Sequence, residues 1–250
     1  MIAVKSSLVE YKELLDSRLE GFDADSFVNA DPLSIVYTLR AKLQRDDSYV
    51  KHIEIGALFV AMIAWGNRKM IRSNATKLME LMNWEPYRFL MNGDFESLPD
   101  GRCIHRTLFG KAFKEVCRAL RDLYGKYESL EEYVLQGRGV SGGYVEQLAK
   151  ITAPARLGSV SGKSACKRLC MYLRWMVRTG VPDLGLWSSI SEGELYAVLD
   201  VHVVREARSR GLISGATANW RAVEELTSHY REWSECDPLK YDVVMMLNDL

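Results

Sequence analysis

The sequence predicts a mainly α-helical protein, and two observations carry that prediction. Apolar residues recur at spacings of three and four along most of the chain, which is the period of an amphipathic helix. β-Branched residues rarely alternate with polar ones, so the signals for strands are weak. The 250 residues, 48% hydrophobic and 26% charged, can bury a sizeable core. We expect one all-α unit over 1–250, with intimate subdomains at about 40–150 and 151–250 and N-terminal helices packed across them.

The first half of the chain divides into helices at recognisable breaks. Residues 7–20 place leucines and a tyrosine at helical spacing and predict an amphipathic helix. Asp31 and Pro32 predict the start of the next helix, because aspartate caps helices and proline is accepted in the first turn. Helical periodicity then runs over 54–82 with an interruption at Gly66–Asn67, where we expect two helices to meet. Further helices are expected around 85–92, 111–124, 128–135 and 143–151.

Bulk properties exclude several classes of protein. The 33 basic and 33 acidic residues cancel, so any nucleic acid must be bound by a local patch. The five cysteines form no CxxC pair and the four histidines are dispersed, which argues against a metal site and favours reduced thiols in a cytoplasm. The longest apolar run, 57–65, is about half a membrane span and predicts a core helix. We therefore predict a cytoplasmic protein without a signal peptide, metal, cofactor or membrane association.

The segment 164–178, "SACKRLCMYLRWMVR", predicts a helix with two different faces. One face is apolar and should be buried; it carries Leu169, Tyr172, Leu173 and Met176. The other should project positive charge; it carries Lys163, Lys167, Arg174 and Arg178. The preceding "GSVSGKS", 158–164, should expose backbone N–H groups able to hold a phosphate, although an ordinary flexible loop is the alternative.

Two side chains are candidates for catalysis. Lys163 is expected at the entrance of that helix, where the helix dipole disfavours an ammonium and a neutral amine would be a nucleophile. A solvated surface lysine is the alternative. Asp200 lies between Leu199 and Val201 and opens the helical segment "VHVVREARSRGLI". It can cap that helix, and a carboxylate held by backbone N–H groups is also oriented for catalysis. His202 is expected to form hydrogen bonds at the helix start.

These motifs resemble the helix-hairpin-helix glycosylase superfamily of DNA repair, which includes endonuclease III and the 8-oxoguanine glycosylases. "GKSACKRLCMYL" is similar to the hairpin and catalytic-lysine helix of that superfamily, and "LDVH" to the segment around its catalytic aspartate. "FVAMIAWGNRKMIRSNATKLMELM" is similar to the segment that plugs the hole left by a flipped base, and "KYDVVMMLNDL" to a late core helix. The resemblance spans roughly 50–250 and is nearest the archaeal 8-oxoguanine branch. The whole chain also resembles an uncharacterised bacterial family with "WGNRK", "SACKRL" and "LDVHV" signatures, and this second resemblance is closer.

The resemblance implies a bifunctional DNA glycosylase/AP lyase that acts from a cleft between two helical subdomains, with 8-oxoguanine as the best guess for the excised base. Lys163 would form a Schiff base with the sugar and Asp200 would stabilise the sugar cation. The usual LPGVGxK hairpin reads "RLGSVSGK" here, so the lysine alignment is open and Lys167 is a substitute. Asp183, in "GVPD", is the substitute for the acid. The C-terminal cysteine cluster is absent, which excludes the iron–sulfur cluster of endonuclease III.

The resemblance also implies that duplex DNA with a damaged base is the partner of a monomeric protein. Phosphate contacts are expected from Gly158, Ser161, Gly162, Ser164, Lys167, Arg174 and Arg178, and the wedge from Asn67 or Arg68. The candidates for a base pocket are Trp65, Tyr172, Trp175, Asp242 and His105, although aromatic residues at helical spacing also occur in cores. The alternative function is a non-catalytic DNA- or RNA-binding protein that kept the fold.

Overall fold

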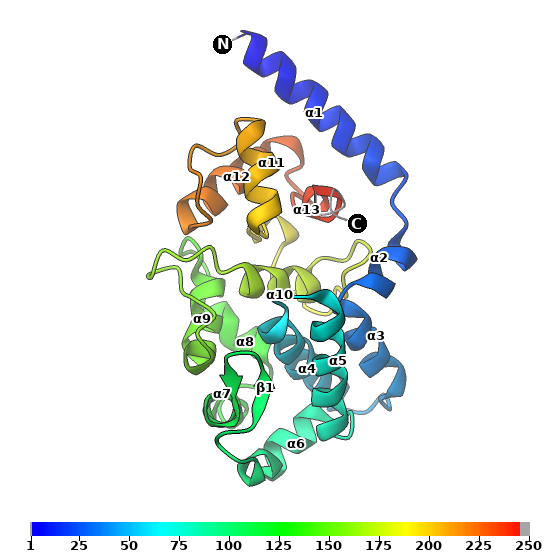
Figure 1. Cartoon of the computed structure of the whole chain (residues 1–250), viewed down its shortest axis with the longest axis vertical. Coiled ribbons are helices and arrows are strands. Elements are labelled where there is room, and N and C mark those ends of the chain that lie inside the picture. The colour runs from blue at the N-terminus through cyan, green and yellow to red at the C-terminus, as the bar shows by residue number, and fades with distance from the viewer. Residues whose placement is uncertain (1, 246–250) are drawn as a thin grey trace. The chain divides into compact units, whose positions relative to one another are not determined.

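The computed structural model describes residues 2–245, with side chains from residue 8 onward, and is dominated by helices (Figure 1). Helices account for 63% of the chain, and the described residues hold 13 α-helices with one small two-stranded sheet. The prediction of a mainly α-helical protein is confirmed. The chain divides into two compact units. We call Asp25–Leu157 the α4 unit, and Met1–Ala24 with Gly158–Leu250 the α10 unit. The predicted subdomain boundaries stay a prediction.

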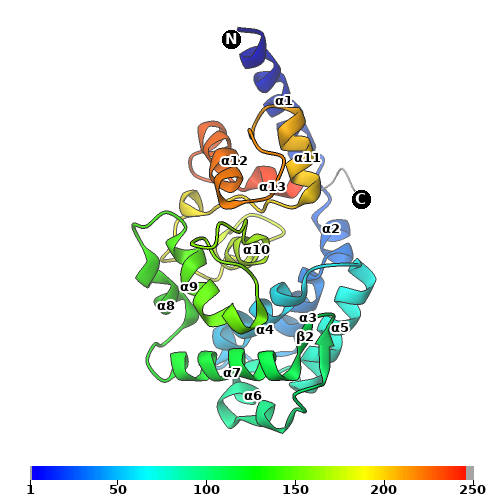
Figure 2. The ribbon, with the colours of Figure 1, turned by 60° about the vertical axis from the view of Figure 1, so that its left-hand side comes forward.

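The α4 unit consists of short and medium helices and a β-hairpin. Its helices are α2 (Ala24–Ala30), α3 (Leu33–Lys42), α4 (Tyr49–Ile63), α5 (Arg68–Leu81), α6 (Pro86–Asn92), α7 (Gly110–Tyr124), α8 (Leu130–Val134) and α9 (Gly143–Thr152). Single 3-10 turns lie at Asp94–Ser97, Leu135–Gly137 and Ala153–Ala155. Strands β1 (Cys103–His105) and β2 (Leu108–Phe109) pair antiparallel, and β2 runs beside α7 (Figure 2). The expected helices over this half are confirmed, and the hairpin is an addition.

Helix α4 forms the centre of its unit because it is apolar on every side. Every residue from His52 to Ile63 is buried, and α3, α5 and α6 pack around the helix. The buried carboxylate of Glu54 accepts hydrogen bonds from the Tyr124 hydroxyl (2.8 Å) and the Leu130 amide (3.2 Å). These donors replace the water that the buried carboxyl group loses on folding.

The predicted breaks lie where the sequence placed them. Asp31 Oδ1 accepts the Leu33 amide at 2.9 Å, so Asp31 caps α3, and Pro32 stands just before its first residue. Helix α4 ends at Ile63 and α5 begins at Arg68. Asn67 caps α5, since its side chain accepts the Met70 amide at 3.2 Å.

The α10 unit combines the first helix with the last third of the chain. Its helices are α1 (Ile2–Glu20), α10 (Lys167–Val177), α11 (Val201–Ser209), α12 (Trp220–Trp233) and α13 (Lys240–Met245), with a 3-10 turn at Glu192–Glu194. Helices α11, α12 and α13 lie together in both views (Figure 2). The late core helix expected in "KYDVVMMLNDL" is present as far as Met245, and the rest lies outside the described residues.

Helix α10 is buried on all sides, although it carries charge. Every residue from Leu169 to Val177 is buried, including Arg174, whose exposed fraction is 2%. Asp183 compensates this charge, because its Oδ1 accepts Arg174 Nε at 3.2 Å and its Oδ2 accepts Arg178 Nη1 at 3.1 Å. Arg178 also makes two bonds of 2.9 Å to the carboxylate of Asp237. Two arginines and two aspartates therefore neutralise one another inside this unit.

Replacing Asp183 by alanine should destabilise the protein strongly. Arg174 and Arg178 would each lose a carboxylate in a dry interior, which costs about 3–5 kcal/mol of unfolding free energy. Urea unfolding at pH 7 measures this loss. Asp237→Ala is the matched control, because the side chain of Asp237 is 26% exposed and water can reach the site. Equal losses in the two variants would contradict this account of the cluster.

Candidate functional site

Lys167 and Asp200 form an ion pair at the starts of two helices of the α10 unit. Lys167 is the first residue of α10, and Asp200 is the N-cap of α11. Lys167 Nζ lies 3.1 Å from Asp200 Oδ2, while Asp200 Oδ1 accepts the amides of His202 (3.0 Å) and Val203 (2.9 Å). The side chains are 38% and 18% exposed, respectively. Three donors thus fix the carboxylate, and the amine stays accessible to solvent.

The Asp200 carboxyl is held in its charged form. Burial alone would raise its pKa, but the Lys167 ammonium and the amides of Val203 and His202 outweigh burial, so the pKa lies below its ordinary value. The expectation that Asp200 caps a helix is confirmed, and His202 contributes its amide at the helix start as predicted.

The structure brings Lys167, and not Lys163, to Asp200. The backbone is left-handed at Lys163 (φ 58°) and at Cys166 (φ 47°), so α10 begins at Lys167 and not at Ser164. Lys163 is exposed in the preceding turn, and its carbonyl accepts the Trp220 amide at 3.2 Å. The prediction that Lys163 stands at the helix entrance was wrong, because the turn delays the helix until Lys167.

The turn at 158–164 uses several of its amides internally. Ser159 Oγ accepts the Gly162 amide and Ser159 O accepts the Ser164 amide, both at 3.0 Å. Gly158 has φ +90°, and a Cβ there would lie 2.2 Å from Ser164 Oγ, so only glycine fits. Ser161 is exposed and bonds to Ser159 Oγ at 3.3 Å. The expected free N–H groups at Gly162 and Ser164 are therefore wrong.

The predicted basic stripe on α10 is not formed. Arg174 and Arg178 point into the core, where Asp183 and Asp237 neutralise them, and Lys167 alone of the helix cations predicted to bind DNA reaches the surface. Asp183 is fully engaged in that cluster, which leaves no carboxylate oxygen for a catalytic role. Helical spacing could not reveal this, because it reports which residues share a face and not which cations are paired inside.

The candidates for a base pocket fall into both units. In the α10 unit Tyr172, Trp175 and Asp242 are buried, and the Tyr172 ring packs edge-on against Trp187 with centroids 5.6 Å apart. Asp242 Oδ2 accepts the Val198 amide at 2.8 Å, two residues before Asp200. Asp242 Oδ1 and Arg174 Nη1 are buried without a hydrogen-bond partner, so an acceptor and a donor of this core stay unsatisfied.

The other two candidates, Trp65 and His105, contact each other in the α4 unit. Their rings are 5.9 Å apart in an edge-on arrangement, and His105 Nε2 lies 3.0 Å from the Trp65 carbonyl. Asn74 Nδ2 lies 2.9 Å from His105 Nδ1. His105 is buried in β1, and these bonds give it a structural role.

The two candidates for a wedge lie at the start of α5. Asn67 and Arg68 are exposed, and Asn67 is engaged as the N-cap. Their insertion into DNA stays a prediction.

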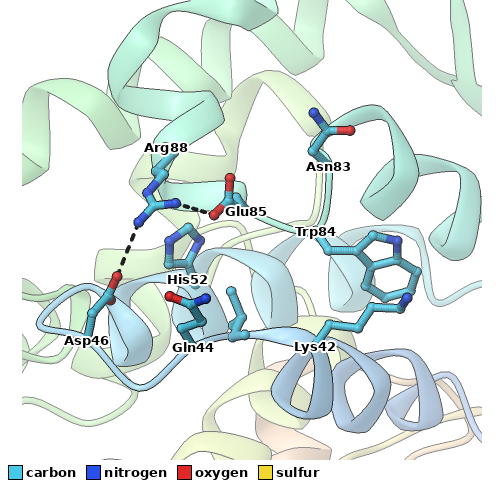
Figure 3. A pocket seen from close by; sticks show the side chains of 9 residues that line it. Lys42, Gln44, Asp46, His52, Asn83, Trp84, Glu85 and Arg88 are labelled. Atoms are coloured by element: carbon cyan, nitrogen blue, oxygen red, sulfur yellow. Dashed lines mark hydrogen bonds and ion pairs between the residues drawn. The ribbon is translucent and has the colours of Figure 1, made fainter.

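A hollow of about 400 Å³ in the α4 unit was not anticipated from the sequence (Figure 3). It is lined by Lys42, Leu43, Gln44, Asp46, His52, Asn83, Trp84, Glu85 and Arg88. Arg88 lies between Glu85 and Asp46 and pairs with both, and Lys42 Nζ lies 5.0 Å from the centre of the Trp84 ring. The lining therefore carries two basic and two acidic side chains, Lys42, Arg88, Asp46 and Glu85.

Among residues 8–245, no three His, Cys, Asp or Glu side chains lie close enough together to bind a metal ion. None of the described helices combines the length and the apolar character needed to cross a bilayer.

Asp242→Asn should remove one source of pH-dependent stability. Burial raises the pKa of Asp242 to about 7, although the Arg174 guanidinium and the Val198 amide act in the opposite direction. The unfolded carboxyl titrates near pH 4, so native stability falls as pH rises from about 4 to about 7, by at most about 1.4 kcal/mol per pH unit. In Asp242→Asn that decline should shrink, because the amide does not titrate and still accepts from Val198. An unchanged slope in urea unfolding between pH 4 and 7 would refute the assignment.

Asp200→Asn should show the opposite pH dependence. Asparagine is as good an N-cap as aspartate, so the variant removes mainly the pairing with Lys167. We expect a loss of about 1 kcal/mol in unfolding free energy at pH 7, since the pair is partly exposed. The folded pKa lies below the unfolded value, so this contribution is present above about pH 4 and lost as pH falls through the folded pKa. Lys167→Met is the control and should lose a similar amount; a deficit that does not vary with pH would contradict the pairing.

Comparison with known proteins corrects the family predicted from the short motifs. No curated protein and no solved structure matches the chain. The helix-hairpin-helix glycosylase family is not detected either, so the resemblance to that superfamily was wrong. Residues 31–249 match the family described as "Protein of unknown function (DUF2400)". Because that match spans most of the sequence, this chain belongs to the DUF2400 family.

Proposed function

We propose that this protein is a DNA glycosylase with AP lyase activity, in which Lys167 is the nucleophile and Asp200 its catalytic partner. One observation carries the proposal: a solvent-accessible amine lies 3.1 Å from a carboxylate that two backbone amides hold in place. An amine beside an oriented carboxylate is the equipment that Schiff-base chemistry on a sugar requires. The proposal rests on this geometry and not on family membership.

The chemistry assigns a separate task to each group. Lys167 must lose a proton before it attacks, and Asp200 Oδ2 is the acceptor within reach. The amine then bonds to C1′ of the nucleotide while the glycosidic bond breaks, and the base leaves with the bonding electrons and takes up a proton. The negative charge of Asp200 stabilises the sugar cation that develops on the way. Opening of the sugar gives an imine at C1′, and loss of a C2′ proton then expels the 3′ phosphate.

Lys167 replaces Lys163 in this proposal because of its position. It begins a buried helix whose direction is fixed, whereas Lys163 belongs to an exposed turn. A nucleophile gains from being held in one orientation, since part of the entropic cost of reaction is then met on folding.

We retain 8-oxoguanine as the first choice of substrate base, because it presents a carbonyl oxygen and an N–H group side by side. The core of the α10 unit holds one donor, Arg174 Nη1, and one acceptor, Asp242 Oδ1, without a hydrogen-bond partner among the described residues. Tyr172 and Trp175 are buried aromatic residues of the same helix as Arg174.

The second candidate function is nucleic-acid binding without catalysis. One observation favours it: Lys167 and Asp200 neutralise each other as an ordinary ion pair at the starts of two helices. Under this alternative the pair only stabilises the α10 unit.

Borohydride trapping on duplexes with 8-oxoguanine, uracil or an abasic site separates the two functions. Borohydride reduces the imine to a stable amine, so the proposed enzyme should yield a covalent protein–DNA adduct. Lys167→Ala should abolish the adduct, whereas Lys163→Ala, a matched change four residues away, should retain it. Asp200→Asn should bind DNA normally and reduce adduct formation by orders of magnitude. An adduct that survives Lys167→Ala would refute the assignment, and no adduct on any duplex would favour the binding protein.

A further inference from the structure

We infer that the α4 unit carries a binding surface for the phosphates of duplex DNA at the start of α5 and on the β1–β2 hairpin. We call this the α5–hairpin surface. It is formed by Arg68, Lys69, Arg72, Arg102 and Arg106, all of which are exposed. The inference deepens the proposed function and rests on it for the choice of DNA as the partner.

The two stretches of sequence that form this surface are positively charged. The segments 65–79 and 101–112 contain no aspartate or glutamate, although acids and bases are equally numerous in the whole chain. Besides the five cations of the surface, they contribute Lys77 and Lys111. A neutral chain has therefore collected positive charge on two stretches that are distant in sequence.

The fold brings these two stretches together. His105, in β1, lies 3.0 Å from the Trp65 carbonyl through Nε2 and 2.9 Å from Asn74 Nδ2 through Nδ1. Strand β1 also packs on α5. Buried His105 thus anchors the hairpin beside the helix that carries the other cations.

The five cations of this surface lack acidic partners among the described residues. Within residues 8–245, no ion pair involves any of the five. Several exposed arginines elsewhere are paired, such as Arg88 with Asp46, Arg118 with Glu96 and Arg221 with Glu225. Like charges gathered without counter-charges repel one another, and a polyanion removes that repulsion while releasing its own counterions.

The side chain of Arg106 is held in position by the residues around it. Its guanidinium stacks over the Trp65 ring, 4.2 Å from the ring centre. Gly66 has φ +102°, and a Cβ there would lie 2.5 Å from Arg106 Nη1, so glycine is required for this close approach. A stacked guanidinium keeps its N–H edge free, and that edge fits two phosphate oxygens.

The α10 unit offers few of the phosphate contacts that were expected from it. Arg174 and Arg178 are buried and neutralised, and the Gly162 and Ser164 amides are engaged in their own turn. Most of the phosphate contacts expected there are therefore not available. A protein that acts on DNA must obtain them from other residues, and the α5–hairpin surface provides unpaired cations.

The test is binding of a short undamaged DNA duplex, measured by fluorescence anisotropy over a range of salt concentrations. The variant is Arg68→Ala, Arg72→Ala and Arg102→Ala combined. Each lost phosphate contact should lower the slope of log K against log salt by about 0.9, so the slope should fall by about 2 to 3 and the affinity at low salt by at least tenfold.

The matched control loses the same charge elsewhere on the α4 unit. It combines Arg45→Ala, Lys126→Ala and Lys150→Ala, three exposed cations outside the surface. Affinity and slope should stay close to wild type in this control, and circular dichroism should show that both variants fold.

Three outcomes would overturn the inference: no salt-dependent binding by wild type, equal losses in the two triple variants, or tighter binding of double-stranded RNA than of DNA. Borohydride trapping stays a separate measurement. If trapping fails while the α5–hairpin variant loses its salt dependence, the inference stands and the lyase function falls.

Discussion

The neutralisation of Arg174 inside the α10 unit is the constraint on which the proposed site depends. A buried guanidinium without a partner would cost several kcal/mol, so α10 can cross the core only where Asp183 meets it. Asp183 also binds Arg178, which in turn binds Asp237. This network fixes the rotation of α10 about its axis. Lys167 stands seven residues before Arg174, on the same side of the helix, so the network also fixes the direction in which the amine leaves the core.

Hydrogen bonds of the backbone on both sides of Asp200 hold this residue in place. Asp242 accepts the Val198 amide, and the amides of His202 and Val203 bind the Asp200 carboxylate. The ion pair between Lys167 and Asp200 therefore joins two rigid parts of one unit. The geometry of this pair is therefore held more firmly than that of an isolated surface ion pair, because little movement is left to its two side chains.

The parts of this arrangement that depend on local chemistry could be predicted from the sequence. Asp200 was expected to cap a helix and does so, and the break at Gly66–Asn67 lies where the helical period is interrupted. Helix α12 was missed, although Val223, Leu226, Thr227 and Tyr230 follow the helical period after the cap residue Asn219. Such a cap and period are sufficient to predict a helix.

The parts that failed depend on contacts between distant residues. Ser164, Ala165 and Cys166 are compatible with a helix, so nothing local announced the left-handed turn that moves the helix start to Lys167. The burial of Arg174 depends on Asp183, in a loop beyond the helix. The family resemblance failed for a related reason, since an aspartate before a helix is a common cap and "LDVH" does not distinguish capping from ancestry.

Arginines are buried and paired with aspartates in the α10 unit, whereas cations are exposed and unpaired on the α5–hairpin surface of the α4 unit. The net charge of the chain therefore does not describe the charge on its surface. In the α10 unit, buried arginines are neutralised by aspartates, and those charges contribute nothing to an external field. On the α5–hairpin surface, the cations lie exposed and form no ion pair among the described residues. The formal net charge counts the buried, paired cations and the exposed, unpaired cations equally, and its value is zero. Because a polyanion responds to charge that is exposed and unpaired, a formal charge of zero is compatible with a nucleic-acid partner.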